Sequence, residues 1–328
     1  HILLKAPGVG TITATVALIN RLYRPVESLL NIQVDFTRSL ALFTRIFDYF
    51  DRENTIVSPE DGKKPAVRDR DIVYEHVAFS YTPEKKILTD VSFTVPGGKM
   101  YAIVGPSGSG KSTLLCCATL LNTMDGGDLI YNGTYAVTDQ DGKSVYADKS
   151  ELKKVREKFG LVFQNFNLFP QYTALENVSL ALKLRVSKKN GSFKAQYEEI
   201  EAKCKAILDS VGLSDKLGFY PHQLSGGQCQ RAAIARALVD DPKLLIFDEA
   251  TSALDVTVQK QIIELLQELQ KEKQLSYLFI CHNLALVQQF CDRVIVLYDG
   301  KIVEAGLPDE VILHPQSEYA TRLINAVF

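Results

Sequence analysis

The segment with the clearest chemical meaning is GPSGSGKS, at residues 105–112. It fits the spacing G-x-x-x-x-G-K-[ST], in which a glycine-rich turn points backbone N–H groups at phosphate oxygens. In such a turn Lys111 would contact the β- and γ-phosphates of a nucleotide, and the Ser112 hydroxyl would bind Mg²⁺. A strand-like run precedes the segment and a helical pattern follows it, which disfavours a plain Gly/Ser turn. We predict nucleotide contacts from Gly105, Ser107, Gly108, Ser109, Gly110, Lys111, Ser112 and Thr113.

A pair of acids, Asp248 and Glu249, directly follows the apolar run LLIF. An acid at the C-terminal end of a strand suits a Mg²⁺ contact, either direct or through water, and the neighbouring glutamate could polarise an attacking water. Taken alone, such a pair is typical of a solvated loop edge. Together with the phosphate-binding segment it predicts Mg²⁺-dependent hydrolysis of a nucleotide.

A second glycine-opened segment, LSGGQCQRAAIARAL, occupies residues 224–238. Glycine in a helix interior costs roughly 1 kcal/mol relative to alanine. At the first turn, however, it lets a ligand approach bare N–H groups at the positive end of the helix dipole. The segment therefore predicts a second anion site in a chain that already has one.

Strands and helices alternate from about residue 71 onwards, which predicts an α/β core with antiparallel pieces at its start. Asp299 and Gly300 form the turn of a predicted terminal hairpin. Short apolar runs indicate strands at 71–81, 91–95, 100–104, 244–247, 277–280 and 294–298. Apolar residues at helical spacing indicate helices at 195–211, 228–239, 256–272 and 284–290.

The N-terminal part has a different character. An apolar stretch at 6–20 is too short to span a bilayer, which needs about 20 residues, so it is either a buried helix or the cytoplasmic end of a longer membrane helix. Helical spacing continues to residue 52, and a helix over 7–52 would be roughly 68 Å long. We assign 1–52 to the end of a transmembrane helix with a cytoplasmic extension, and the Pro- and Gly-containing stretch 53–70 to a linker.

Composition narrows the classes of partner. The 328 residues carry a formal net charge of -2 and no basic run, which argues against nucleic acid as a partner. The six cysteines include no CxxC pair, so they indicate reduced thiols in the cytosol rather than a zinc site.

The motifs stand together in a characteristic order: the phosphate-binding segment, the glutamine of VFQNF, LSGGQ, DEATSALD and the histidine of CHNLA. In this order they resemble the nucleotide-binding domain of an ABC transporter, over about residues 71–328. The resemblance implies an NTPase core of ABC type, with an antiparallel β subdomain and an inserted helical subdomain at about 165–232. It also implies Mg²⁺-dependent ATP hydrolysis that drives transport, at the cytoplasmic face of the plasma (inner) membrane.

The resemblance further implies partners and residue roles. Two such domains face each other and share two ATPs, and both attach to transmembrane domains of the transporter. Tyr81 would stack on adenine, Gln164 would sense Mg²⁺ and the attacking water, and His282 would contact the γ-phosphate. From the partner chain, Ser225, Gly226, Gly227 and Gln228 would close over the nucleotide and Asp255 would reach across. Structural alternatives are a strand aromatic at Tyr81, a surface amide at Gln164 and a strand-end histidine at His282.

Two parts of the chain resemble different classes of ABC transporter. Residues 1–115 resemble an exporter half-transporter, whereas the chain from about 121 to 328 resembles the ATPase subunit of an amino-acid or peptide importer. The direction of transport therefore stays open. Cys229 and Cys281 depart from the residues usual at their positions but leave the reactive groups in place. The alternative functions are a soluble ABC-type ATPase without transport and a regulatory module that does not hydrolyse ATP.

Overall fold

The computed structural model describes residues 71–325, apart from 83–84, 187–192 and 253. The predicted helix over 7–52 and the predicted linker over 53–70 lie outside this range. Within the described ranges, no helix is long and apolar enough to cross a membrane.

A six-stranded sheet forms the centre of the described structure, in the order β11-β10-β3-β9-β8-β7. All neighbouring strands are parallel except β10 and β11, which form the antiparallel hairpin predicted at Asp299-Gly300. Its strands are β3 (Met100–Val104), β7 (Phe159–Phe163), β8 (Leu244–Asp248), β9 (Ser276–Ile280), β10 (Arg293–Tyr298) and β11 (Lys301–Gly306).

The central strands are buried on both faces, as expected for parallel strands between covering layers. In β3, Met100, Ala102 and Val104 pack into one apolar cluster, whereas Tyr101 and Ile103 pack into another. The first cluster contains the buried faces of α5 to α8, and the second contains the antiparallel sheet and α2.

The second sheet is antiparallel, in the order β2-β1-β4-β5-β6. Strands were expected at 71–81 and 91–95, and the structure extends both. It also adds three strands that the sequence analysis did not predict. The bounds are β1 (Ile72–Thr82), β2 (Lys85–Val95), β4 (Gly126–Tyr131), β5 (Thr134–Gln140) and β6 (Lys143–Tyr146).

The predicted helices are present within a few residues of their expected bounds. They are α5 (Phe193–Ser210), α6 (Gly226–Leu238), α7 (Val256–Lys273) and α8 (Leu284–Phe290). Further helices are α2 (Lys111–Ala118), α3 (Lys149–Arg156), α4 (Ala174–Leu184), α9 (Pro308–Leu313) and α10 (Glu318–Asn325), with short 3₁₀ turns at Ser214–Lys216 and Pro221–Gln223.

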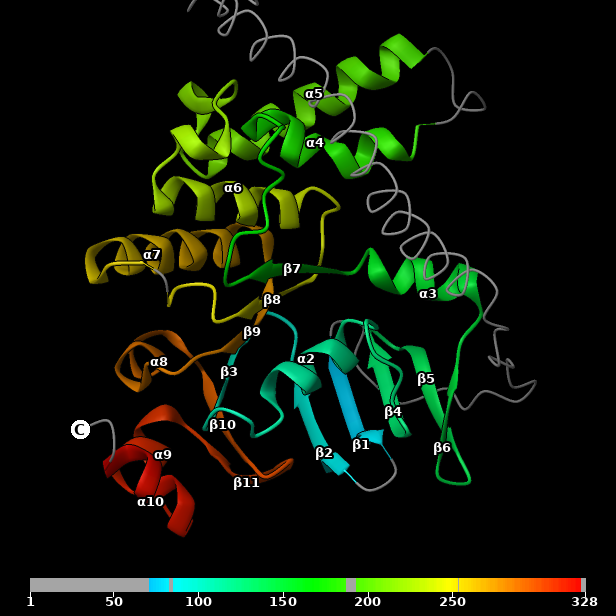
Figure 1. The fold of residues 1–328 in the computed structure, drawn as a ribbon, viewed down its shortest axis with the longest axis vertical. Coiled ribbons are helices and arrows are strands. Elements are labelled where there is room, and N and C mark those ends of the chain that lie inside the picture. The colour runs from blue at the N-terminus through cyan, green and yellow to red at the C-terminus, as the bar shows by residue number, and fades with distance from the viewer. Residues whose placement is uncertain (1–70, 83–84, 187–192, 253, 326–328) are drawn as a thin grey trace, which may run out of the picture. The chain divides into compact units, whose positions relative to one another are not determined.

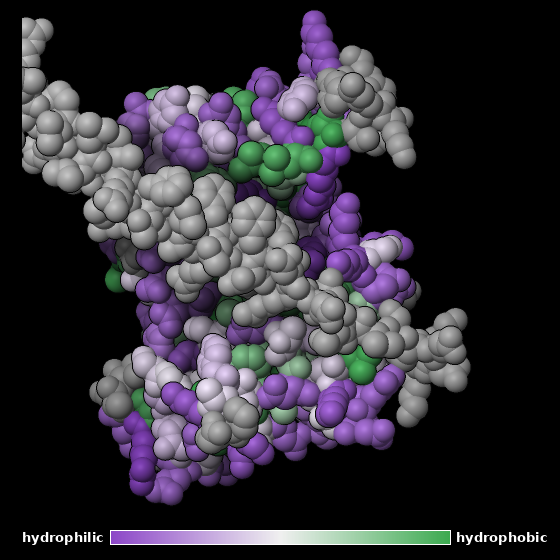
Figure 2. All heavy atoms as spheres, turned by 45° about the vertical axis from the view of Figure 1, so that its right-hand side comes forward, coloured by the Kyte–Doolittle hydropathy of each residue, from purple (hydrophilic) through white to green (hydrophobic). Residues whose placement is uncertain are grey.

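The helices α4, α5 and α6 gather at one end of the described structure, away from the antiparallel sheet (Figure 1). Figure 2 shows a largely hydrophilic surface on which apolar side chains gather at this helical end. Leu184, the last residue of α4, is 78% exposed there. The bounds predicted for a helical subdomain, 165–232, stay a prediction.

Candidate nucleotide-binding site

The phosphate-binding segment connects β3 to α2 at the C-terminal end of the parallel strands. Its backbone needs glycine at two positions. A Cβ on Gly105 would lie 2.1 Å from the carbonyl oxygen of Leu297, and Gly110 has a left-handed φ of +98° at the start of α2. A tight, left-handed entry into a helix is the geometry that exposes N–H groups to an anion.

Lys111 is 5% exposed, and its ammonium is bound by the segment itself. The Nζ atom donates to the carbonyl oxygens of Gly105, at 2.8 Å, and of Pro106, at 2.7 Å. Burial lowers the pKa of Lys111, while the charges of Glu249 and Asp248 act in the opposite direction. A phosphate oxygen would compete well for this ammonium, because a charge-assisted hydrogen bond is stronger than one to a neutral carbonyl.

A pocket of about 390 Å³ lies in front of the segment. It brings together most of the predicted nucleotide contacts with Tyr81, Glu249 and His282, although these come from separate parts of the chain. The segment contributes Ser107, Gly108, Gly110, Lys111, Ser112 and Thr113. Gly105 and Ser109 do not line the pocket. Both lie behind it, where the N–H of Gly300 donates to the carbonyl oxygen of Ser109 at 3.1 Å.

The outer wall of the pocket comes from β1 and β2. Tyr81 is 62% exposed, and its ring meets Phe79 edge-on at a centroid distance of 4.8 Å, which leaves a ring face available for stacking. Lys85 and Ile87 of β2 also line the pocket, and the sequence analysis missed them. The signal that could have found them is hairpin pairing, because β2 returns antiparallel beside Tyr81 with Thr82 opposite Lys85.

The two acids differ in their surroundings. Asp248 ends β8, and its Oδ1 atom is buried without a hydrogen-bond partner among the described residues. Burial raises the pKa of Asp248, the charge of Glu249 raises it further, and Lys111 opposes both. A buried, unpaired carboxylate oxygen is costly unless a partner or cation satisfies it. This oxygen therefore fits the predicted Mg²⁺ contact, although Asp248 itself does not line the pocket, whereas Ser112 does and is exposed.

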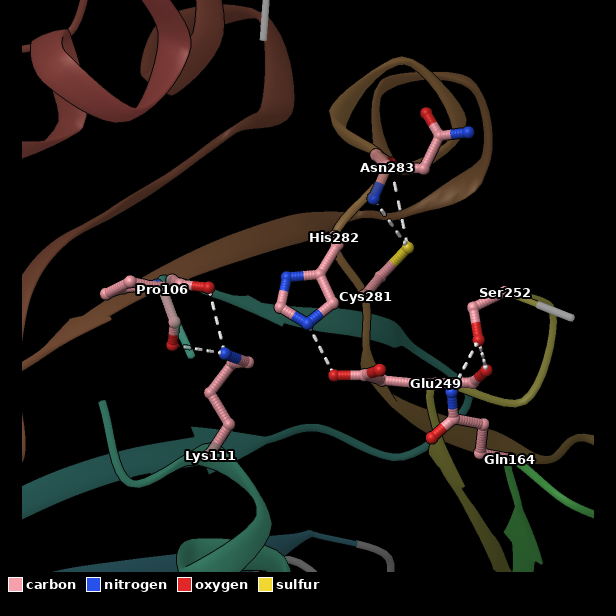
Figure 3. A network of polar contacts seen from close by, with 9 residues as sticks. Pro106, Lys111, Gln164, Glu249, Ser252, Cys281, His282 and Asn283 are labelled. Atoms are coloured by element: carbon pink, nitrogen blue, oxygen red, sulfur yellow. Dashed lines mark hydrogen bonds and ion pairs between the residues drawn. The ribbon is translucent and has the colours of Figure 1, made fainter. Parts of the chain in front are cut away.

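Glu249 lies at the centre of a polar network (Figure 3). One carboxylate oxygen lies 2.5 Å from Nε2 of His282, and the Glu249 backbone is left-handed, with a φ of +50°. The Ser252 hydroxyl donates to the Glu249 carbonyl at 2.8 Å, and the Gln164 amide donates to the Ser252 oxygen at 3.2 Å. Lys111 and Glu249 point into the same space beside the His282 ring. The predicted catalytic residues thus converge, and Ser252 is a link that sequence reasoning missed.

The second glycine segment lies elsewhere. Ser225 and Gln228 form a reciprocal cap at the start of α6: the Ser225 hydroxyl accepts from the Gln228 N–H at 3.3 Å, and the Gln228 side chain accepts from the Ser225 N–H at 2.9 Å. Asp255 caps α7 from one side only: its carboxylate accepts from the N–H of Val258 at 2.9 Å. Ser225 and Gly226 are exposed. None of the predicted partner-facing residues lines the pocket that holds Lys111.

The two glycines of this segment face different constraints. A Cβ on Gly227 would lie 2.6 Å from a methyl group of Val258 on α7, which is too close for any side chain without movement. A Cβ on Gly226 would lie 3.3 Å from Leu254, a tight contact but not a prohibitive one. Gly227 is therefore required by helix packing, whereas Gly226 is the more accessible of the two.

These features define a class of protein: an α/β nucleotide-binding domain with a phosphate-binding segment, a glutamate-histidine pair and a second, outward-facing glycine segment. The ABC transporter family matches residues 88–252. The chain belongs to this family of ATP-binding domains. The predicted ABC-type fold and the enzyme class, an ABC-type ATPase, are confirmed, whereas the long N-terminal helix predicted with that fold lies outside the described residues.

Two named relatives are ATP-binding subunits. The chain is 40% identical over 242 residues to the methionine import ATP-binding protein MetN of Lactobacillus johnsonii, covering 74% of this chain and 66% of that protein. It is 40% identical over 248 residues to MetN of Haemophilus influenzae, covering 75% and 67%. The chain thus spans about two thirds of the length of these relatives. They favour the transporter class over a soluble ATPase without transport.

Solved structures show the same fold. A dimeric ATP-binding cassette, described in a post-hydrolysis state bound to ADP and Pi, is 33% identical, with a TM-score of 0.60 over 72% of this chain and 98% of that one. The protein cbiO1 of Clostridium perfringens, part of the ABC transporter complex cbiONQ, is 28% identical, with a TM-score of 0.64 over 79% and 96%.

Proposed function

We propose that this chain binds Mg²⁺-ATP in front of residues 105–112 and hydrolyses it with Glu249 as the base that activates water. The observation that carries the proposal is the contact of 2.5 Å between Glu249 and His282, at the wall of the pocket that also holds Lys111. A carboxylate within reach of the terminal phosphate, beside a buried cation, suits in-line attack by a water molecule.

Each group has a role that follows from its position. The Lys111 ammonium exchanges its carbonyl partners for phosphate oxygens, and Tyr81 offers a ring face to adenine. Ser112 and the unpaired Asp248 oxygen hold Mg²⁺, which neutralises charge on the phosphate oxygens when it is bound. His282 holds the Glu249 carboxylate in place beside the γ-phosphate. Gln164, connected to Glu249 through Ser252, senses Mg²⁺ and the attacking water at this end of the pocket.

The active assembly contains two nucleotide-binding domains. Ser225, Gly226, Gly227 and Gln228 lie outside their own chain's pocket, and the cassette with 33% identity is a dimer. We propose that these residues, with Asp255, complete the ATP site of a facing domain. Membrane domains of a transporter are the further partners, which places the complex at the cytoplasmic face of the plasma (inner) membrane. Nucleic acid is not among the proposed partners.

The proposed cargo is an amino acid of the methionine type, moved inward, because the named relatives are methionine import subunits. The exporter-like character of residues 1–115 is the competing indication. Uptake of labelled methionine by cells that make this chain with its membrane subunit decides the direction. Uptake that is equal with the wild type and with Glu249→Gln would rule out import powered by this chain.

Hydrolysis itself is tested by the same substitution in the purified chain. Glu249→Gln keeps the shape of the side chain and one acceptor oxygen but removes the base. We expect ATP binding to be retained and turnover to fall by at least about 10²-fold, the low end for loss of a general base. Undiminished steady-state hydrolysis would contradict the proposal.

A further inference from the structure

The turn that follows Gln164 has an unusual backbone. Phe166 and Asn167 are both left-handed, with φ of +58° and +48°. Asparagine adopts this conformation readily, but it is unfavourable for a bulky residue such as Phe166, so the surrounding structure has to hold it there. The turn begins two residues beyond Gln164, whose amide contacts Ser252 in the Glu249 network.

Arg236, near the C-terminal end of α6, binds the backbone at Phe166 and Asn167. Its Nη1 atom donates to the carbonyl oxygen of Asn167 at 2.5 Å, and its Nη2 atom donates to the carbonyl oxygen of Phe166 at 2.9 Å. The two N–H groups of one planar guanidinium therefore bind two successive carbonyl oxygens. A lysine at this position could not reproduce the fork, because its ammonium is a compact point charge.

The helix that carries Arg236 is firmly placed against the strand that leads to Gln164. Gly160 of β7 lies so close to α6 that a Cβ there would be 2.4 Å from the carbonyl oxygen of Ala237. Just beyond α6, Asp240 accepts two hydrogen bonds from Arg185, at 2.8 and 3.1 Å, and Asp241 pairs with Lys203 at 2.5 Å. The C-terminal end of α6 is thus fixed to α4 and α5.

The rest of the loop has its own support, so the roles can be separated. Asn177 of α4 is 1% exposed, and its side chain accepts from the Phe169 N–H at 2.7 Å. It also donates to the carbonyl oxygens of Phe169, Tyr172 and Thr173 at 2.9 to 3.1 Å. Asn177 therefore holds the segment from Phe169 onwards, whereas the carbonyl oxygens of Phe166 and Asn167, next to Gln164, are bound by Arg236.

We infer that Arg236 is a positioning residue, which holds Gln164 within reach of Ser252 and Glu249 and ties its position to that of α6. The same helix begins with the exposed Ser225 cap and Gly226, about 15 Å from Arg236 along the helix axis at 1.5 Å per residue. A shift of α6 when a nucleotide engages its first turn would therefore move the turn behind Gln164. This inference rests on the proposed hydrolysis and adds to it a physical link between the two glycine segments.

The test compares Arg236→Ala, Arg236→Lys, Gln164→Ala and the double variant Arg236→Ala/Gln164→Ala in the full chain. The matched control is Arg231→Gln, since Arg231 lies on the same helix but donates to the carbonyl oxygen of Val211, at 2.9 Å, rather than to this turn. Steady-state ATPase rates give kcat and KM, and thermal unfolding reports folding.

We expect Arg236→Ala to lower kcat by about 10- to 100-fold, because a misplacement of about 1 Å can cost that much. The KM for ATP should stay within about twofold, since the Lys111 and Tyr81 contacts are untouched. Arg236→Lys should recover only part of the rate. In the Gln164→Ala background, loss of Arg236 should have no further effect beyond about twofold, because the two residues act through one path.

Independent, multiplying effects of the two substitutions, or an equal loss of kcat in Arg231→Gln, would overturn the inference. If Arg236→Ala fails to fold, Arg236→Lys becomes the deciding variant. A kcat equal to that of the wild type in Arg236→Lys would then overturn the inference. The outcomes also separate this inference from the proposed function. If Glu249→Gln is fully active, both the proposed function and this inference are wrong. If Glu249→Gln is inactive but Arg236→Ala is fully active, only this inference is wrong.

Discussion

The Nε2 atom of His282 lies 2.5 Å from a carboxylate oxygen of Glu249, although the two residues are 33 positions apart. Strand register explains the contact. Asp248 at the end of β8 pairs with Ile280 at the end of the parallel neighbour β9, so the residues just beyond both strands emerge side by side. The N–H of Glu249 completes the junction by donating to the carbonyl oxygen of Ile280 at 3.1 Å.

If His282 acts by holding the Glu249 carboxylate, the two residues form one unit and their losses should not multiply. We expect His282→Ala to lower kcat strongly. The double variant His282→Ala/Glu249→Gln should have about the same rate as the slower of the two single variants, as for other groups that act together. Single-turnover ATPase rates provide the measurement. A double variant slowed by the product of the two effects would show that His282 contributes through a separate contact.

Tyr81 should provide the platform for adenine, because its exposed ring lies in the wall of the nucleotide pocket. Stacking of a base on an aromatic ring is worth about 1–3 kcal/mol. Tyr81→Ala should therefore raise the Kd for ATP by roughly 5- to 150-fold, and Tyr81→Phe should leave it nearly unchanged. Titration with a fluorescent ATP analogue measures both. Equal affinities for all three proteins would contradict the role.

Gly226→Asp should separate nucleotide binding from dimer formation. A carboxylate at this exposed position would meet the γ-phosphate held by a facing chain, and like charges in a closed interface cost several kcal/mol. The variant should bind ATP as a monomer, fail to dimerise with ATP and hydrolyse poorly. Nucleotide titration and sizing with ATP are the measurements. Loss of ATP binding by the isolated monomer would place the segment in its own chain's pocket.

A mixture of chains sharpens this test. In a dimer of Gly226→Asp with Lys111→Ala, one composite site joins the two damaged halves and the other joins two intact halves. We expect ATPase activity to reappear on mixing two proteins that are nearly inactive alone. A strictly additive rate at every mixing ratio would argue against sites shared between chains.

Gly227→Ala should reduce the free energy of unfolding, because the new methyl group would lie 2.6 Å from Val258. Overpacking of this kind typically costs about 1–3 kcal/mol. Gly226→Ala is the matched control, since its Cβ would meet only Leu254, at 3.3 Å. Urea unfolding of both variants measures the difference. Recovery of stability in Gly227→Ala/Val258→Ala would confirm the cause, and equal stability of the two single variants would refute it.

Asp248→Asn should stabilise the nucleotide-free protein, increasingly so as the pH rises. The pKa of Asp248 in the folded chain is raised above its ordinary value of 3.8, mainly by burial. The unfolded chain therefore releases this proton at lower pH than the folded chain, and ionisation destabilises the fold as the pH rises through that interval. Denaturant midpoints at about pH 4 and pH 7 give the measurement. A difference between variant and wild type that is constant with pH would contradict the assignment.

The sequence predicted the parallel strands other than β7, and the residues at their ends, because both signals are local. Short apolar runs mark buried strands, and the glycine spacing of residues 105–112 fits one backbone geometry. Most of the central sheet and the phosphate-binding segment were therefore predictable, whereas β7 (Phe159–Phe163) was not among the predicted strands. The roles assigned to the individual site residues stay predictions, although the structure brings most of them into one pocket and one network.

What the sequence analysis missed depends on contacts distant in sequence. The strands β4, β5 and β6 contain many polar residues and are defined by pairing in series: β4 pairs with β1, β5 with β4 and β6 with β5. Lys85 and Ile87 enter the pocket only through hairpin pairing, and Ser252 enters the Glu249 network only through a turn. The helix α4 begins with a reciprocal cap between Thr173 and Glu176, a local signal that was present but not used.

The hydroxyl of Ser225 caps α6, and the role proposed for it at the ATP site of a facing chain would use a different part of the same group. As the cap of α6 it only accepts a hydrogen bond, from the N–H of Gln228, and a serine hydroxyl keeps a hydrogen to donate elsewhere. Aspartate would cap the helix equally well but would bring a negative charge and no proton donor. Alanine would not obstruct an approaching phosphate, but it would lose the hydrogen bond that caps α6. If Ser225 also contacts a phosphate held by a facing chain, as proposed, the stability of α6 and the recognition of that phosphate would depend on a single oxygen atom.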